Sequence, residues 1–514
     1  MNFAAQVKLN ARNSPDKPAL FFEDTTYTWR DIDRQTDKFA NYLREAGYEI
    51  GDSLALYAPN VPEFVIAFYG ALKAGVIAMP LNTRFEVQEI EGLLEHIGHC
   101  GIVTLPRFNK VVEELELHDV KHVIVGGDQL PARDDVDIIR FETLLKRTES
   151  GFDTVPRSNA DHAFYMHTSG TTGRPKPVIA THENVRTHAL GYLDRVELSR
   201  NDVALNTIPI FHVGGLNLHL TLFTQLGAPQ LLIDGWDVEK TLRGIEEYDV
   251  SYMFLIATML YDLANFEDAD RYDTESLGIV GAGGQNVPPA VIERFEEQHS
   301  AQVLEGYGLT ESMPAIISNA RDDRRLGTAG KPIENSAHIQ VVDPENWEQE
   351  RDPGELGELL ASGDAITPGY LDRPDANEET FEVDDDGVEW LRTGDIVRRD
   401  EEGYISIEDR VDHMIISGGE NVYPNEIEEV LYDIPGVGEA VVVGEPDERF
   451  GERVVAVVVA SDESLTEEAI IEYFRTETPL ADYKRPRRVI FVDKIPRAGA
   501  GKIDRLKVEA ELLN

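Results

Sequence analysis

The sequence predicts an α/β fold with a large N-terminal part, a small antiparallel β part and an α+β module at the C-terminus. Three observations predict it. Short runs of β-branched residues alternate with amphipathic helical stretches over most of the chain. Beyond about Ile333 the texture changes to short strands and Gly/Pro/Asp turns, and the C-terminal segment again mixes helices with strands. The length of 514 residues favours more than one domain.

The N-terminal alternation indicates βαβ units. Ser53–Tyr57 is expected to be a strand, Glu63–Ala74 a helix and Ile77–Pro80 the next strand. Strands separated by segments of helix length predict a largely parallel sheet. The same alternation returns at Val203–Thr207, Leu216–Leu226, Gln230–Ile233, Val238–Glu247, Val250–Leu255 and Thr258–Asn265.

The remaining elements are shorter or more mixed. The small antiparallel β part is expected to contain the strands Ala337–Val342, Gly357–Ser362 and Gly403–Glu408. Asp409–Asp412 then leads into the C-terminal module. The expected helices of that module are Pro424–Ile434 and Glu467–Glu477, and its expected strands are Val437–Gly444, Arg453–Ala460 and Arg488–Val492.

The charge of the chain describes its solvent. It carries 95 Asp and Glu against 48 Lys and Arg, a formal net charge of −47, and only 14 of the basic residues are lysines. A hydrophobic fraction of 42% argues against acidic disorder. Such a surface repels nucleic acid, so we expect no nucleic-acid partner. Acidic excess with few lysines is typical of adaptation to high salt, as in a halophilic archaeon, where screening weakens self-repulsion.

Other global features favour a soluble cytoplasmic protein. The single cysteine, Cys100, excludes a disulfide framework and a multi-cysteine metal site within this chain. Residues 1–10 contain no basic segment followed by an apolar run, so no signal peptide is expected. The longest apolar stretch, Val65–Leu81, is interrupted by Lys73 and small residues, so no transmembrane segment is expected either.

The most informative segment is Met166–Ile179, with the sequence MHTSGTTGRPKPVI. It follows an apolar strand, Ala163–Met166. Glycines let backbone N–H groups turn towards an anion, hydroxyl groups add donors, and a lysine adds a mobile positive charge. The spacing differs from a Walker A loop, and the alternative is a surface turn rich in Ser and Thr. The phosphate-binding loop predicted here consists of Thr168, Ser169, Gly170, Thr171, Thr172, Gly173 and Lys176.

This segment resembles the signature loop of the adenylate-forming superfamily, which contains acyl- and aryl-CoA synthetases, luciferases and peptide-synthetase adenylation domains. Tyr307–Glu311 (YGLTE) is similar to a second motif of the family, in which the carboxylate binds Mg²⁺. Alternatively, Thr310 caps the N-terminus of a helix here. Gly281–Gln285 resembles the turn that binds adenine. The resemblance assigns the metal to Glu311 and nucleotide contacts to Gly283, Gly284, Gln285, Glu305, Gly306, Tyr307, Gly308 and Thr310.

Arg392–Asp395 resembles the TGD motif of the same family, in which the aspartate accepts hydrogen bonds from the ribose hydroxyls. A carboxylate with two acceptor oxygens suits a vicinal diol. The resemblance gives Arg410 a contact to ribose or phosphate and makes Asp412 the hinge. It therefore implies an N-terminal domain of layered αβα subdomains plus a small β subdomain over residues 1–409, a hinge at 410–412 and a mobile C-terminal domain over 413–514.

Two further segments complete the resemblance. Pro496–Ile503 resembles the final motif of the family, in which Lys502 reaches the substrate carboxylate and the α-phosphate and offsets negative charge. Pro209–Gly215 (PIFHVGG) is similar to the segment in which His212 lines the acyl pocket. Gly418 and Gly419 would line the pantetheine path. The catalytic residues implied are Lys502, Thr168, Lys176, Glu311 and His212, whereas His162, His167 and His182 are interpreted as structural or surface residues.

The resemblance implies an ATP-dependent acid–CoA ligase that uses Mg²⁺, with CoA as co-substrate and a medium- or long-chain fatty acid as substrate. The alternatives are a benzoate-like aryl acid, a carrier-protein thiol as acceptor, or an adenylate-binding protein without turnover. A homodimer is compatible with the resemblance. Three positions depart from the family pattern: Pro177 and Asp409 where glycine is usual, and Ala257 where many relatives have proline.

Overall fold

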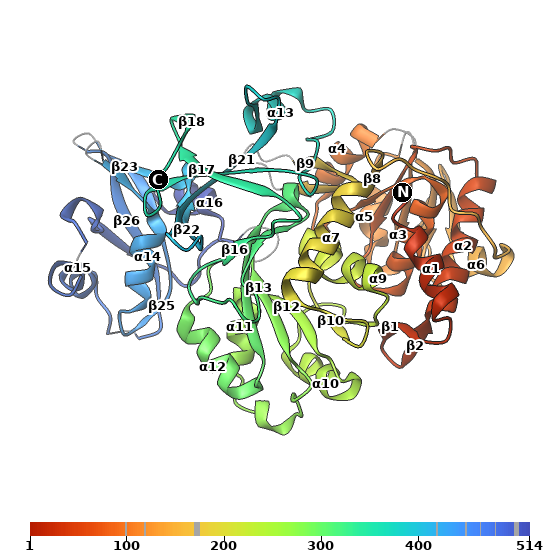
Figure 1. The fold of residues 1–514 in the computed structure, drawn as a ribbon, viewed down its shortest axis with the longest axis horizontal. Helices are drawn as coiled ribbons and strands as arrows, with labels where there is room; N and C mark the ends of the chain where they lie inside the picture. The colour runs from red at the N-terminus through yellow and green to blue at the C-terminus, as the bar shows by residue number, and fades with distance from the viewer. Residues whose placement is uncertain are drawn as a thin grey trace. The chain divides into compact units, whose positions relative to one another are not determined.

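The computed structural model describes residues 1–97, 100–117, 120–168, 175–417, 420–447, 450–462, 464–478, 480–497 and 503–513. The chain divides into two compact units (Figure 1). The larger unit comprises Met1–Ile339 and Ala361–Leu391, and the smaller comprises Gln340–Leu360 and Arg392–Asn514. The division into residues 1–409, 410–412 and 413–514 stays a prediction.

The first sheet of the larger unit has seven strands in the order β7-β6-β5-β3-β4-β8-β9. All neighbours pair in parallel except β8 and β9, which form an antiparallel hairpin at one edge. This confirms the predicted parallel pairing. The strands are β3 (Ser53–Tyr57), β4 (Ile77–Pro80), β5 (Cys100–Thr104), β6 (Val120–Val125), β7 (Asp137–Arg140), β8 (His162–Thr168) and β9 (Lys176–Thr181).

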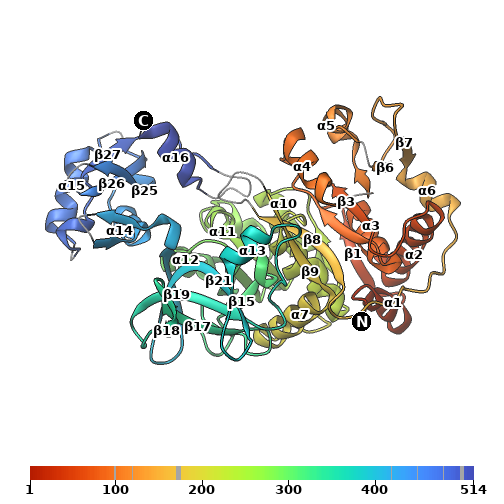
Figure 2. The same cartoon turned by 90° about the horizontal axis from the view of Figure 1, so that it is seen from above.

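Helices cover both faces of this sheet (Figure 2). Successive side chains of a strand point to opposite faces, so β3 contributes to two separate cores. Leu54 and Leu56 pack with helices of one layer, whereas Ala55 and Tyr57 pack with helices of the other. The first layer contains α2 (Trp29–Glu45), α3 (Pro62–Ala74) and α6 (Phe141–Arg147), and the second contains α4 (Val87–Ile97) and α5 (Asn109–Glu114).

The second sheet of the larger unit has nine strands in the order β16-β15-β14-β13-β12-β10-β11-β1-β2. The pairs from β14 through β1 are parallel. Its strands are β1 (Pro18–Phe22), β2 (Thr25–Thr28), β10 (Ala204–Asn206), β11 (Gln230–Leu232), β12 (Tyr252–Ile256), β13 (Ile279–Gly283), β14 (Gln302–Gly308), β15 (Ala315–Ser318) and β16 (Lys331–Pro332).

Helices again lie on both faces of the nine-stranded sheet. Met253 and Leu255 pack with α10, α11 and α12, whereas Tyr252 packs with α7 and α9. Both sheets are therefore layered as expected. One predicted helix, Leu216–Leu226, is partly wrong, because it starts with a π-helical turn over Leu216–Thr221. The helices are α1 (Ala5–Asn13), α7 (His182–Val196), α8 (Val213–Gly215), α9 (Leu222–Leu226), α10 (Val238–Tyr248), α11 (Ala257–Ala264), α12 (Pro289–His299) and α13 (Pro374–Thr380).

The expected antiparallel β part is a six-stranded sheet in the order β18-β17-β19-β21-β20, with β22 on β21. The pairs β17–β18, β20–β21 and β21–β22 are antiparallel. The strands are β17 (His338–Asp343), β18 (Asn346–Glu350), β19 (Leu356–Ser362), β20 (Phe381–Val383), β21 (Glu389–Arg399) and β22 (Ile405–Arg410).

The C-terminal module contains the expected mixture of helices and strands. Its sheet has the order β24-β23-β26-β25, with β27 on β26. Val442 packs with α14 and α15 on one face, and Val441 and Val443 pack with α16 on the other. The elements are β23 (Ile415–Ser417), β24 (Glu420–Val422), α14 (Pro424–Tyr432), β25 (Val437–Asp447), β26 (Gly451–Ala460), α15 (Glu467–Thr476), β27 (Arg488–Phe491) and α16 (Arg505–Leu512).

A buried ion-pair network joins helices α2 and α3. The Lys73 side chain is 0% exposed, and its Nζ lies 2.6 Å from carboxylate oxygens of both Asp33 and Asp37. Asp37 also accepts hydrogen bonds from the backbone N–H groups of Gly151 and Phe152. The lysine thus lies inside the core of the larger unit. None of the helices among the residues described is both long and apolar enough to cross a membrane.

Replacing Lys73 by methionine should strongly destabilise the larger unit. The substitution leaves a buried carboxylate without its cation, which typically costs about 3–5 kcal/mol. Chemical denaturation at constant salt measures the shift of the unfolding transition. The matched control is Lys240→Met, because Lys240 is exposed on α10 and its loss should change stability by less than about 0.5 kcal/mol. Equal shifts for both variants would contradict the importance of the network.

Candidate active site

The β8–β9 hairpin carries the predicted phosphate-binding loop. Thr168 ends β8, Lys176 begins β9, and the two residues pair directly across the hairpin. Pro177 occupies the next position of β9, and its carbonyl oxygen accepts a hydrogen bond from the N–H of Leu371 at 2.9 Å. Proline lacks only the N–H, so this pairing is retained. The predicted residues Ser169, Gly170, Thr171, Thr172 and Gly173 lie outside the described residues.

A tyrosine that the sequence analysis missed connects two predicted site residues. Tyr370 Oη donates a hydrogen bond to Glu311 Oε1 at 2.7 Å, and both side chains are buried. Lys176 Nζ lies 5.3 Å from the centroid of the Tyr370 ring. Glu311 and Lys176 are therefore both brought to Tyr370, the carboxylate to its hydroxyl and the ammonium to its ring. A buried carboxylate held beside a lysine fits a site for Mg²⁺ and phosphate, because Mg²⁺ takes one or two carboxylates together with phosphate oxygens.

The only available signal for Tyr370 in the sequence was the Pro368-Gly369 turn that precedes it. A turn of this kind does not reveal which strand the chain then joins. In the structure Tyr370 pairs with Val178 of β9. The contact thus depends on tertiary structure that local patterns do not encode.

The turn after β14 depends on a glycine. A Cβ atom on Gly308 would lie 1.5 Å from the carbonyl oxygen of Pro314, so only glycine fits this approach. Ser312 Oγ donates to the same oxygen at 2.5 Å and accepts from the N–H of Leu309 at 3.0 Å. A short 3₁₀ helix starts at Thr310, with Leu309 at the N-cap position, so the expected capping by Thr310 is wrong.

The turns after β13 and β14 lie side by side. Residues 279–282 of β13 pair in parallel with residues 302–305 of β14. A Cβ on Gly283 would lie 2.8 Å from the carbonyl oxygen of Gly306, and Gly284 has φ +83°. The backbone of the two turns thus approaches closely, because glycine has no side chain to separate them. The structure brings together the predicted residues Gly283, Gly284, Gln285, Gly306, Tyr307 and Gly308.

Glu305 is a buried carboxyl group beneath these turns. Its side chain is 9% exposed, and Oε2 accepts a hydrogen bond from the N–H of Gly327 at 3.1 Å. Desolvation by burial raises the pKa of Glu305 to about 7, against an opposing effect of the Gly327 hydrogen bond. The Glu305 carbonyl accepts from the N–H of Asn319 at 2.9 Å. Glu305 is thus held through its side chain and its backbone by the segments around Gly327 and Asn319.

The wall expected to line the acyl group is aromatic and rich in glycine. Phe254 on β12 is half-buried, and Cβ atoms on Gly281 and Gly283 would lie 2.9 and 3.3 Å from its ring. His219 Nε2 accepts from the Phe254 N–H at 3.1 Å. His212 precedes α8 and the π-helical turn, an irregularity frequent at functional sites. The helix α11 begins at Ala257, a position where proline is also favoured.

His167 is held by contacts within the protein, in agreement with the structural alternative expected from the sequence. Its Nε2 accepts a hydrogen bond from the N–H of Asn82 at 3.2 Å, and its ring meets Phe85 edge to face. Burial, followed by the charge of the nearby His212, lowers the pKa of His167 to about 3. The ring is therefore neutral at ordinary pH, with its proton on Nδ1.

The smaller unit brings together the two residues predicted to bind ribose. Asp395 and Arg410 are paired across β21 and β22, and Arg410 Nη1 donates to Asp395 Oδ1 at 3.1 Å. Gly394 has φ +69°, and a Cβ there would lie 2.9 Å from Arg410 Nη2. The glycine therefore gives the guanidinium room beside the carboxylate.

Asp409 has a structural explanation. It is 2% exposed, and its Oδ1 accepts from the N–H of Arg410 at 2.7 Å. Its Oδ2 accepts from the N–H of Asn425 at 2.8 Å, in the first turn of α14. A carboxylate stabilises the positive end of a helix dipole. Asp409 therefore fastens β22 to α14, a role that glycine cannot perform.

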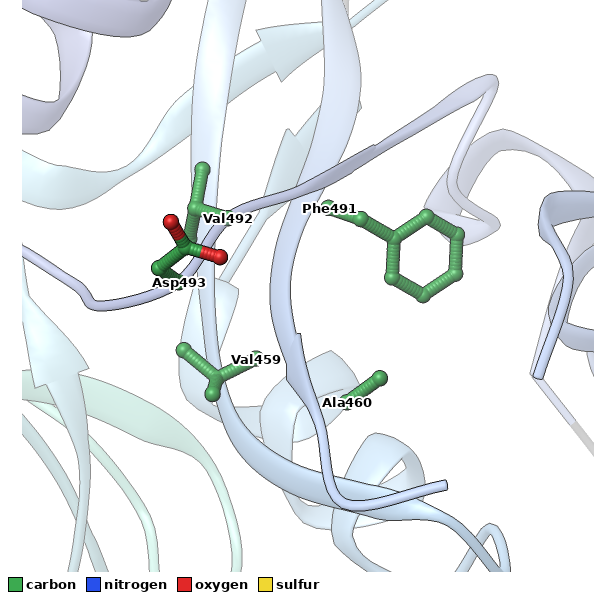
Figure 3. A pocket seen from close by; sticks show the side chains of 5 residues that line it. All are labelled: Val459, Ala460, Phe491, Val492 and Asp493. Carbon is green, nitrogen blue, oxygen red and sulfur yellow. The ribbon is translucent and has the colours of Figure 1, made fainter. Parts of the chain in front are cut away.

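Three predicted site residues remain to be placed. Gly418, Gly419 and Lys502 lie outside the described residues. Figure 3 shows a surface hollow in the C-terminal module beside the ends of β26 and β27. Its lining differs from the predicted site residues and consists of Val459, Ala460, Phe491, Val492 and Asp493.

Glu305→Gln should remove a pH dependence of stability. The folded-state pKa of about 7 exceeds the ordinary value of 4.5, so the contribution of Glu305 to stability is largest at low pH and falls as the pH rises from about 4.5 to about 7. Thermal midpoints measured from about pH 5 to about pH 8 should fall less in the variant, which should be more stable above neutral pH. Glu297→Gln, at an exposed position of α12, is the control. Identical pH profiles for Glu305→Gln and wild type would contradict the burial argument.

Comparison with known proteins identifies the family of the chain. The AMP-binding enzyme family matches residues 7–371, and the AMP-binding enzyme C-terminal domain matches residues 426–502. The long-chain-fatty-acid–CoA ligase of Salmonella typhimurium is 33% identical, covering 96% of this chain and 92% of its own.

Solved structures share the whole fold. The anthranilate CoA ligase AuaEII in complex with anthranoyl-AMP has a TM-score of 0.89 at 25% identity, covering 99% of this chain and 97% of its own. The o-succinylbenzoate coenzyme A synthetase of Bacillus subtilis, in complex with ATP and a magnesium ion, has a TM-score of 0.83 at 28% identity, covering 98% and 99%. The chain therefore belongs to the AMP-binding enzyme family.

Proposed function

We propose that this AMP-forming acyl-CoA ligase activates a carboxylic acid with an uncharged, hydrophobic tail, namely a medium- or long-chain fatty acid, and transfers the acyl group to coenzyme A. The observation that carries the substrate proposal is the apolar environment of Phe254. Gly281 and Gly283 let the backbone approach its ring closely, and Gly214 lies on another edge, where a Cβ would be 3.6 Å away.

The charge of the pocket segments supports the same substrate. Among the residues of His212–Leu218, Phe254–Met259 and Gly306–Pro314, the only Asp, Glu, Lys or Arg is Glu311. Glu311 is bonded to Tyr370. A second charge on the substrate would find no counter-ion in these segments, and burying an unpaired charge is costly. An apolar tail carries no such penalty.

The reaction has two balanced steps. A carboxylate oxygen of the acid forms a bond to the α-phosphorus of ATP, and the bond from that phosphorus to pyrophosphate breaks. The sulfur of CoA then bonds to the acyl carbon, AMP leaves with the carboxyl-derived oxygen, and the thiol proton goes to solvent. No protein nucleophile is required, so catalysis consists of positioning anions and neutralising their charge.

Each predicted site residue would have a role in this reaction. At the phosphate end, Thr168, Lys176 and the loop Ser169–Gly173 would bind phosphate oxygens, and Glu311 would hold Mg²⁺, which neutralises phosphate charge when bound. Asp395 and Arg410 would bind ribose, and Lys502 would bridge the carboxylate and the α-phosphate. His212 would line the acyl pocket, and Gly418 and Gly419 the pantetheine path. The proposed adenine site consists of Gly283, Gly284, Gln285, Glu305, Gly306, Tyr307, Gly308 and Thr310.

The second candidate substrate is a benzoate-like aryl acid. The anthranilate ligase has the same fold along 99% of this chain, and the aromatic face of Phe254 would suit a planar ring. A carrier-protein thiol in place of CoA is a further alternative. We also propose that residues 413–514 rotate about Asp412 between the two steps. The proposed location is the cytoplasm, and the proposed assembly is a homodimer.

The substrate is tested by measuring pyrophosphate release with medium-chain, long-chain and aryl carboxylates, with and without CoA. We expect the aliphatic acids to give the highest rates at high KCl. Lowering the salt should reduce the rate, because the net charge of −47 then repels anionic substrates more strongly. Highest rates with aryl acids would favour the second candidate, and release that is independent of every acid would overturn the proposal.

Lys502→Ala should separate the two steps. Adenylate formation should fall by at least about 100-fold, because charge stabilisation of this kind is commonly worth that much. Thioester formation from synthetic acyl-adenylate should largely survive. The two half-reactions are measured separately, by ATP–pyrophosphate exchange and by CoA consumption. An equal loss in both would refute the role proposed for this lysine.

A further inference from the structure

The segment of residues 364–371, here called the strap, pairs with the outer edge of β9. The N–H of Ile179 donates to the carbonyl of Gly369 at 3.0 Å, and the N–H of Leu371 donates to the carbonyl of Pro177 at 2.9 Å. Tyr370 pairs with Val178 between these bonds. The strap therefore continues the seven-stranded sheet beyond the hairpin that carries the phosphate loop.

Two asparagines fix the backbone of the strap. Asn184 Nδ2 donates to the carbonyl oxygens of Asp364 and Ile366, at 2.8 Å each. Asn377 Oδ1 accepts from the N–H of Tyr370 at 2.8 Å, and its Nδ2 donates to the Tyr370 carbonyl at 3.1 Å. Both backbone groups of Tyr370 are thus satisfied by one side chain, which leaves the tyrosine little freedom to move.

The strap holds Glu311 at two points. The N–H of Thr367 donates to the Glu311 carbonyl at 2.8 Å, and Tyr370 Oη donates to Glu311 Oε1 at 2.7 Å. The Thr367 hydroxyl in turn donates to the carbonyl of Ile179 on β9 at 2.6 Å. Both the backbone and the carboxylate of Glu311 are therefore held against the strand that begins with Lys176.

The aromatic ring of Tyr370 faces Lys176. The ammonium lies 5.3 Å from the ring centroid, within the range of a cation–π interaction. An aromatic face attracts the ammonium without cancelling its formal charge. A carboxylate at this place would neutralise the lysine and weaken its attraction for phosphate.

We propose that Tyr370 is a positioning residue that orients the Glu311 carboxylate through its hydroxyl and the Lys176 ammonium through its ring. The inference rests on the proposed function, in which these two groups serve Mg²⁺ and phosphate. Mg²⁺ demands near-ideal octahedral geometry, so its binding is sensitive to rotation of a carboxylate ligand. Partners that orient metal ligands typically change metal affinity 10–100-fold when they are removed.

A purely structural role makes a different prediction. The Tyr370 side chain is 7% exposed, and its ring centroid lies 6.3 Å from that of Phe381. If packing were its only role, phenylalanine would replace it without consequence. Tyr370→Phe therefore separates the two hypotheses, because it keeps the ring beside Lys176 and removes only the hydroxyl that bonds Glu311.

The test measures ATP binding by calorimetry over a series of Mg²⁺ concentrations. In Tyr370→Phe we expect the Mg²⁺ concentration for half-maximal enhancement of ATP affinity to rise at least about tenfold. ATP affinity without Mg²⁺ should stay unchanged. Tyr370→Leu should lower that metal-free affinity as well, because it also removes the ring that faces Lys176. ATP–pyrophosphate exchange should show the same two patterns.

Tyr57→Phe is the matched control. Tyr57 is 2% exposed in the same unit, and its hydroxyl donates to the carbonyl of Thr83 at 3.2 Å. We expect no change in Mg²⁺ dependence for this variant. Thermal midpoints of all variants show whether they are folded, and Tyr370→Trp, which keeps an aromatic face, provides a second variant without the phenol.

Glu311→Gln distinguishes the inference from the function on which it rests. A changed Mg²⁺ dependence in Glu311→Gln together with an unchanged one in folded Tyr370→Phe would overturn the positioning role alone. An unchanged Mg²⁺ dependence in Glu311→Gln would overturn the metal-binding role of Glu311 instead. A shift in the Tyr57→Phe control equal to that in Tyr370→Phe would also overturn the inference, because the effect would then not be specific.

Discussion

Parallel strand pairing is the constraint on which the predicted adenine and acyl parts of the candidate site depend. In a parallel sheet the carboxyl ends of the strands lie along one edge, so the segments that follow them meet there. His212 follows β10, Gly284 follows β13, and Tyr307 lies at the end of β14. These segments could be far apart in a meander, where successive strands end at opposite edges. The approach is close enough that a Cβ atom on Gly283 would lie 2.8 Å from the carbonyl oxygen of Gly306.

The net charge of the chain contrasts with the local surroundings of two of its lysines. The chain has a net charge of −47, yet its proposed substrates are anions. Lys73 is buried against two carboxylates and serves stability, whereas Lys176 faces an aromatic ring. The first lysine is neutralised by its partners, and the second keeps its attraction for phosphate. The local partner of a lysine therefore determines whether it stabilises the fold or serves binding.

The three departures from the family pattern are all accommodated locally. Pro177 keeps the carbonyl that bonds the strap, and Ala257 occupies the first position of α11. Asp409 adds two hydrogen bonds that fasten Arg410 and the start of α14. Asp409 thus supplies two acceptors that glycine lacks, and with glycine the N–H groups of Arg410 and Asn425 would need other partners.

The sequence by itself determined most element types and offered the motif residues of the candidate site. Ser53–Tyr57 and Ile77–Pro80 have the predicted bounds, because alternating patterns and flanking turns are local signals. The motif residues Lys176, Glu311, Asp395 and Arg410 were also recognisable. The π-helical start of Leu216–Thr221 was not, because it depends on how that turn packs.

Only the tertiary structure decided how these residues are held. Tyr370 is separated from Lys176 by 194 positions and from Glu311 by 59 in the chain. The neutral form of His167 results from burial and the charge of His212, and its hydrogen bond from Asn82 fixes which ring nitrogen accepts. Hydrogen bonds between distant side chains leave no periodic trace in a sequence. Periodicity reports which face of an element is buried, whereas the partner of each polar group is known only when the elements have packed.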